Sequence, residues 1–142
     1  MKRILLLFSL ILFSTTLCGC RPRRPFQYER SYFDGVYNVE IINVILEDPI
    51  EYEVLKTIQG ETLSVFLDEL SELTFHEVYG RPYRGTGLSI KINYEDRYLV
   101  ISEGETWQNN QDNEFIPGSI IYHGRSDETL EFINKWLNQM SE

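Results

Sequence analysis

Residues 88–102 read LSIKINYEDRYLVIS, and this stretch decides the fold. Apolar and polar residues alternate from Leu88 to Tyr94, which is the pattern of a half-buried β-strand. Glu95 and Asp96 form a tight turn into a second strand over residues 97–102. The sequence therefore predicts an antiparallel β-hairpin.

Further strands are predicted on both sides of this hairpin, at residues 37–46, 51–58, 75–79 and 119–123, and residues 105–108 continue the meander after it. In the first of them the apolar residues do not keep to one face, because the alternation changes phase at Ile41 and Ile42. A central strand or a β-bulge at this point would explain the pattern.

Two helices are predicted from apolar residues that recur every three or four positions. The first has the stripe Leu63, Phe66, Leu67, Leu70 and Leu73, and it starts at Gly60 or Thr62. The second is capped by Ser126 and has the stripe Leu130, Ile133, Leu137 and Met140, with Trp136 beside it.

The predicted elements run β-β-α-β-β-β-β-α, and short turns join consecutive strands. This order predicts an α+β fold, a two-layer sandwich of a mostly antiparallel sheet with both amphipathic helices packed on one face. The 142 residues suffice for one domain. We expect residues 31–142 to form this single acidic domain as a monomer.

The first twenty residues have the composition of a secretory signal peptide. A basic start, Lys2-Arg3, precedes an apolar run from Ile4 to Phe13 that only Ser9 interrupts. A membrane-spanning helix is the alternative, but Ile4 to Leu17 would extend only about 21 Å against a hydrocarbon core of about 30 Å.

The tetrad Leu17-Cys18-Gly19-Cys20 ends this segment. It resembles the lipobox of bacterial lipoproteins, with Leu17 at −3, Gly19 at −1 and the cysteine at +1. The resemblance covers residues 1–20, and Cys18 at −2 is small but departs from the commoner Ser, Ala or Thr. It implies cleavage after residue 19, a diacylglyceryl group on the Cys20 sulfur, further acylation such as palmitate on the new amine, and an extracytoplasmic location on a bacterial membrane. An ordinary signal peptide that releases a secreted protein is the alternative.

A basic stem follows the cysteine. Residues 21–30, RPRRPFQYER, carry +3, and their two prolines favour an extended tether, so we assign residues 20–30 as the lipidated cysteine and its linker. Residues 31–142 carry −14, with 7 basic and 21 acidic side chains. The stem suits anionic headgroups, whereas the acidic body excludes nucleic acid as a partner.

Residue patterns typical of catalysis are missing from this sequence. His76 and His123 are isolated, no Cys/His cluster has metal-ligand spacing, and the run HGRSD at 123–127 reads as a turn and a helix cap. No phosphate-binding loop is present, and no spacing singles out two of the many carboxylates. We therefore assign no catalytic, cofactor or metal residue.

The loop GRPYRGTG at 80–87 is the best candidate for a partner-binding site. Arg81, Tyr83 and Arg84 are residue types that anchor interfaces, and they form a positive spot in an acidic body. A glycine-rich connection with locally paired arginines is the structural alternative. Tyr94, Tyr98, Trp107 and Tyr122 form a second aromatic set that we assign to sheet packing rather than to a sugar platform.

Two functions remain open. The sequence favours a membrane-anchored, non-catalytic binding or accessory module of the cell envelope, with a protein or other envelope component as partner. The alternative is a small extracytoplasmic enzyme that acts on envelope sugars or peptides.

Overall fold

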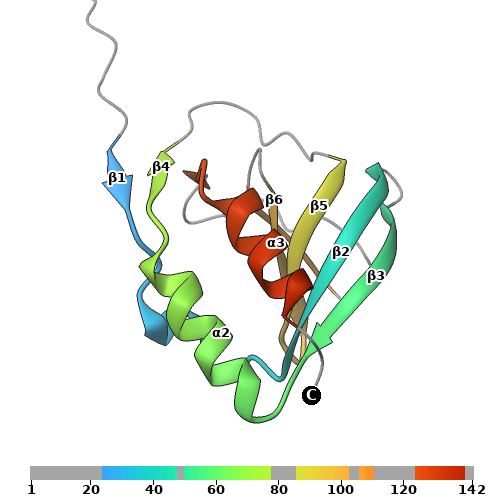
Figure 1. Ribbon diagram of the computed structural model, residues 1–142, viewed down its shortest axis with the longest axis horizontal. Helices are drawn as coiled ribbons and strands as arrows, with labels where there is room; N and C mark the ends of the chain where they lie inside the picture. The colour runs from blue at the N-terminus through green and yellow to red at the C-terminus, as the bar shows by residue number, and fades with distance from the viewer. Residues whose placement is uncertain (1–23, 48–49, 78–85, 103–105, 111–123, 140–142) are drawn as a thin grey trace, which may run out of the picture.

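The computed structural model describes residues 24–47, 50–77, 86–102, 106–110 and 124–139 (Figure 1). Within these residues the elements are, in order, β1 (Pro25–Phe26), the 3-10 helix η1 (Arg30–Phe33), β2 (Asn38–Glu47), β3 (Ile50–Ile58), α2 (Glu61–Glu72), β4 (Phe75–Glu77), β5 (Gly87–Asn93), β6 (Arg97–Ser102), β7 (Thr106–Asn110), β8 (Gly124–Arg125) and α3 (Thr129–Asn138).

The predicted hairpin is the centre of the larger sheet. β5 and β6 pair antiparallel with Ile90 opposite Ile101, and the Tyr94 N–H closes the turn by donating to the Arg97 carbonyl at 2.9 Å. The five strands lie in the order β3-β2-β5-β6-β7, and every neighbouring pair is antiparallel.

The central-strand explanation for the phase change at Ile41 and Ile42 is confirmed, and the β-bulge at this point lies in the neighbouring β3 rather than in β2. β2 is a central strand between β3 and β5, and its register with β3 jumps between these two residues, so that Leu55 has no partner. Because of this arrangement Ile41 packs into the core on the helix side, while Ile42 is buried on the opposite face.

Both helices cover one face of this sheet, as predicted. α3 lies against β5 and β6, and α2 packs beside α3 through Phe66, whose ring centroid is 5.1 Å from that of Phe132 and 5.0 Å from that of Trp136 (Figure 1). One continuous core joins these aromatic rings to the apolar side chains of the sheet, Val39, Ile41, Ile90, Ile92, Leu99 and Ile101. The α+β sandwich is thus confirmed.

A second, three-stranded sheet was not predicted. β4 pairs antiparallel with β1 on one side and with β8 on the other, in the order β1-β4-β8. The first of these strands comes from the stem, and Tyr28 just after it is only 4% exposed. The packed domain therefore begins at Pro25 rather than at residue 31.

The start and the buried face of α3 differ in detail from the prediction. The helix begins at Thr129, and Ser126 holds the preceding turn because its Oγ accepts the Glu128 N–H at 3.3 Å. Phe132 is buried, whereas Leu130 is 37% exposed. The predicted strand at 119–123 lies outside the described residues.

Candidate functional site

The site residues singled out from the sequence lie mainly outside the described residues. This holds for Cys20, for the loop residues Arg81, Tyr83 and Arg84, and for His123. His76 is described, and its side chain is exposed on β4 opposite Pro25. The proposals for these residues therefore stay predictions.

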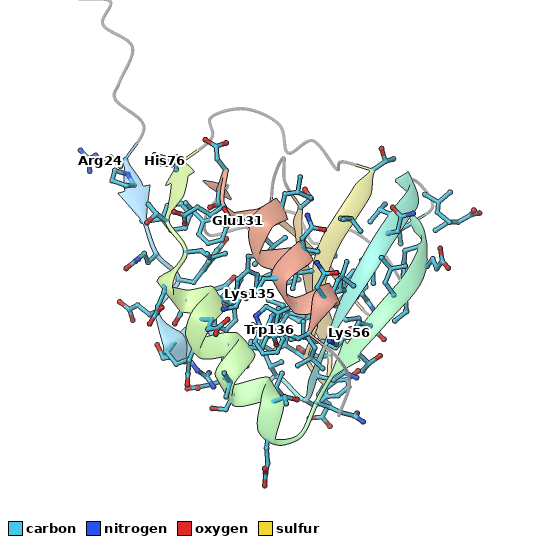
Figure 2. The ribbon with its side chains drawn as sticks, in the orientation of Figure 1. Arg24, Lys56, His76, Glu131, Lys135 and Trp136 are labelled. Atoms are coloured by element: carbon cyan, nitrogen blue, oxygen red, sulfur yellow. The ribbon has the colours of Figure 1, made fainter. Side chains whose placement is uncertain are left out.

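The described residues form a groove of about 540 Å³ between the end of α2 and the first half of α3. We call it the α2–α3 groove. It is lined by Glu69, Glu72, Leu73, Glu128, Glu131, Phe132 and Lys135. Figure 2 labels Glu131 and Lys135 on α3, on the side of the helix that looks toward α2.

Helical spacing places these side chains together. Glu69, Glu72 and Leu73 are three and four residues apart and so share one face at the end of α2. Glu128, Glu131, Phe132 and Lys135 have the same spacing at and beyond the start of α3. Two helical faces rich in glutamate thus border one groove.

Glu69 is the structural link between the two helices. Its Oε2 accepts hydrogen bonds from Lys135 Nζ at 2.8 Å and from Trp136 Nε1 at 2.9 Å. The Trp136 side chain is 5% exposed, so this carboxylate satisfies an indole N–H that would otherwise lose its partner on burial. Glu69 therefore belongs to the scaffold of the groove.

Glu128 also supports the scaffold. Its Oε2 accepts the Thr74 N–H at 3.2 Å, which ties the segment after α2 to the start of α3. The Glu72 carbonyl accepts a hydrogen bond from Gln27 Nε2 at 2.7 Å, which brings the stem to the same end of the groove.

Glu72 and Glu131 are the carboxylates of the groove that the scaffold does not use. Among the described residues, neither carboxylate has a hydrogen-bond or ion-pair partner, and both side chains are exposed. Four carboxylates face the one ammonium of Lys135, beside the apolar surfaces of Leu73 and Phe132. This combination suits a ligand that carries positive charge and an apolar group.

A second polar cluster lies on the face of the sheet opposite the helices. Lys91 Nζ donates to Glu40 Oε2 at 2.9 Å and lies 4.9 Å from the ring centroids of both Tyr52 and Tyr98. Burial opposes the charge of Lys91, but hydrogen bonds to Tyr52 and Glu40 and the charge of Glu40 raise its pKa above the ordinary value.

This cluster is part of a buried layer. Ser89, Lys91 and Asn93 are at most 8% exposed, although strict alternation is typical of a strand with one solvated face. Asn93 donates through Nδ2 to Asn38 Oδ1 at 2.7 Å. The mutual pairing of these polar groups marks them as structural.

The aromatic set does not form one platform in the part that is described. Tyr94 and Tyr98 are 4% and 2% exposed and belong to the cores on opposite faces of the sheet. Their assignment to sheet packing is confirmed, whereas the side chains of Trp107 and Tyr122 lie outside the described residues.

The sequence interpretation missed the groove. It had no means of choosing among the 21 carboxylates of residues 31–142, because the groove forms only where two helices meet. The spacing of Glu128, Glu131 and Lys135 was the available signal, since it repeats that of Glu69 and Glu72.

Within the described residues, no three His, Cys, Asp or Glu side chains are placed to hold a metal ion. Over the same residues, no helix is both long and apolar enough to cross a bilayer. Comparison of the chain with protein-family models, with curated proteins and with solved structures found no match.

Proposed function

We propose that this chain is a membrane-anchored extracytoplasmic lipoprotein of the bacterial envelope that acts as a small, non-catalytic binding or accessory module. Its anchor is a lipid on Cys20, supported by the basic start, the apolar run and the tetrad Leu17-Cys18-Gly19-Cys20. Two or more acyl chains make such attachment effectively permanent, because each buried CH₂ contributes about 0.8 kcal/mol.

The binding surface is the α2–α3 groove. The observation that supports it is the pair Glu72 and Glu131, two exposed carboxylates that make no hydrogen bond or ion pair to other described residues and that line the groove together with apolar Leu73 and Phe132. Such a surface attracts a cationic segment of a protein or another cationic envelope component by charge complementarity.

Binding fits the groove better than catalysis does. Its glutamates stand at the surface, with Glu72, Glu128 and Glu131 exposed, whereas carboxylic acids that donate protons in enzymes are generally desolvated. A shallow charged surface also leaves water in contact with the ligand, which weakens the electrostatic effects on which catalysis depends.

A small extracytoplasmic enzyme acting on envelope sugars or peptides is the second candidate. One observation favours it, namely that Glu72 and Glu131 line the same groove. A pair of carboxylates on either side of a bond is the usual requirement for glycoside hydrolysis.

Capture from the envelope of the source cells tests the first proposal. The lipidated protein, cross-linked in its own membrane, is expected to capture a partner whose yield falls when Glu72→Gln and Glu131→Gln are combined. Glu61→Gln is the matched control, since Glu61 is an exposed acid at the opposite end of α2. Equal capture by the double variant and the control would rule out the groove.

The single variant Glu131→Gln, again with Glu61→Gln as the control, tests the enzyme. Purified protein is incubated with cell-wall fragments and the products are followed by mass spectrometry. A product that forms with the wild type and with Glu61→Gln, and that disappears with Glu131→Gln, would establish the second candidate.

A further inference from the structure

The stem of this chain enters the fold directly after its run of arginines. Pro25 and Phe26 form β1, which pairs with His76 and Phe75 of β4. The Phe26 ring stacks on the Phe75 ring with 5.8 Å between centroids. The start of β1 is therefore fixed to the body of the domain.

Tyr28 strengthens this attachment. Its ring is 4% exposed and contacts those of Phe26, Tyr32, Phe33 and Phe75, with centroid distances from 4.9 to 5.9 Å. Two residues later, Arg30 Nε donates to Asp68 Oδ1 of α2 at 2.7 Å. Residues 25–30 thus belong to the packed domain and are not free to extend as a linker.

Only the four residues 21–24 remain between Cys20 and β1. A fully extended chain spans at most about 3.6 Å per residue, so the Cα atoms of Cys20 and Pro25 are at most about 18 Å apart. A linker over 20–30, as expected from the prolines, would reach about twice as far. The folded stem halves the reach of the tether.

A short tether restricts which end of the domain can face the membrane. Figure 1 shows β1 and β4 at one end of the molecule and the beginning of α2 at the opposite end. α2 alone separates these ends by about 17 Å along its axis. Arg24 and His76 lie side by side at the β1–β4 end, as Figure 2 shows and as the pairing of Pro25 with His76 requires.

Charge acts in the same direction. Arg21, Arg23 and Arg24 precede β1, while residues 31–142 carry −14. Anionic headgroups attract each basic residue near the surface by about 1 kcal/mol and repel the acidic body, within a screening length of about 8–10 Å. The stem end is thus drawn to the headgroups and the rest of the body is pushed away from them.

We propose that the β1–β4 end of the anchored domain faces an anionic phospholipid surface, with Arg24 and His76 at the headgroups. The proposal rests on the lipid at Cys20. The α2–α3 groove then lies close to this end, because Gln27 donates a hydrogen bond to the Glu72 carbonyl and the Thr74 N–H donates one to Glu128. Its ligand must accordingly lie near the bilayer.

Short-range fluorescence quenching tests the orientation. His76→Cys and Glu61→Cys each provide a cysteine for a dye at an exposed position. Position 76 lies at the β1–β4 end, and position 61 lies at the far end of α2. The lipidated protein is reconstituted in phosphatidylcholine–phosphatidylglycerol vesicles that contain a headgroup-linked quencher. Strong loss of fluorescence is expected at position 76 and little loss at position 61.

A lengthened stem is the control. Insertion of about 20 Gly and Ser residues between Arg24 and Pro25 adds a root-mean-square span of about 25 Å, so the difference between the two positions should shrink or vanish. Vesicle flotation separates the two proposals. Protein that floats and is quenched equally at both positions overturns the orientation alone, whereas protein that does not float overturns the lipid anchor and the orientation with it.

Discussion

The ring of Tyr28 lies 4.9 Å from the ring of Phe75, centroid to centroid, with 71° between their planes. Tyr28 comes from a proline-rich, basic stem, and Phe75 belongs to a strand 47 residues later in the chain. This edge-to-face contact fastens the stem to the domain, and it sets both the boundary of the fold and the length of the tether.

The stem should therefore contribute to stability. A fragment 24–142 is expected to fold, whereas 31–142 loses β1 and Tyr28 and should be less stable by more than about 3 kcal/mol. Tyr28→Ala in the longer fragment should cost about 3 kcal/mol for the same reason, while Tyr28→Phe should change stability by less than about 1 kcal/mol. Urea denaturation measures all four proteins, and equal midpoints for the two fragments would contradict this view of the stem.

Removing one partner of the Glu40–Lys91 pair should destabilise the domain, whereas replacing both partners with apolar residues should change its stability little. Their side chains are 19% and 11% exposed, so Lys91→Met leaves a poorly solvated carboxylate and should cost about 3 kcal/mol. Adding Glu40→Leu should restore most of that loss, because no uncompensated charge remains.

A double-mutant cycle in urea measures this coupling. Asp68→Asn is the control, since its pair with Arg30 is 62% and 40% exposed and should contribute less than about 1 kcal/mol. Equal losses for Lys91→Met and Asp68→Asn would show that the pair is not structural.

Lys56 should stabilise the end of α3. Its Nζ donates to the Trp136 carbonyl at 2.7 Å and to the Gln139 carbonyl at 2.6 Å, at the negative end of the helix dipole (Figure 2). Lys56→Met should cost about 1–2 kcal/mol and speed amide exchange in the last turn. Lys135→Met removes the bond to Glu69 but no hydrogen bond to a helix carbonyl, so it should change that exchange less; the same exchange rates in both variants would argue against the cap.

Alkaline pH should unfold the domain through its buried tyrosines. Burial, with Tyr32 nearby, raises the pKa of Tyr94 to about 12, and burial raises the pKa of Tyr28 above its usual range. Both phenols ionise near pH 10 in the unfolded chain. In the folded state they lose their protons only at a higher pH.

The contribution of these protonated tyrosines to the free energy of unfolding is then complete below about pH 10 and is lost as pH rises toward 12. Denaturation midpoints measured between pH 8 and about 11.5 should show this decline, and Tyr94→Phe should make it less steep. An unchanged slope in that variant would remove Tyr94 as a cause.

The sequence was sufficient where a pattern is local. The hairpin at Leu88–Ser102, the phase change at Ile41 and Ile42 and the apolar stripe of α2 each depend on residues close together in the chain, and each was predicted correctly. The antiparallel character of the sheet followed from the short turns between strands, whereas the pairing of β2 with β5 was not predicted.

The rest depends on pairings between distant segments. β1 has only two residues and begins with proline, so nothing local indicates a strand until β4 supplies its partner. The burial of Lys91 requires Glu40, Tyr52 and Tyr98 to surround it, and alternation along β5 alone assigns it to solvent. The α2–α3 groove likewise exists only because the fold brings Glu69 and Glu128 together.

The proposed lipid on Cys20 underlies the function and the orientation proposed for this protein, and the intact mass of the mature chain tests it most directly. The wild type purified from bacterial membranes is expected to begin at residue 20 with the added mass of a diacylglyceryl group, and the Cys18→Ala variant should do the same. Cys20→Ala should lack the lipid and stay uncleaved or be released, because cleavage leaves no other cysteine in the mature chain. A wild-type mass that matches an unmodified chain, cut anywhere other than before Cys20, would contradict the lipoprotein assignment and leave a secreted domain.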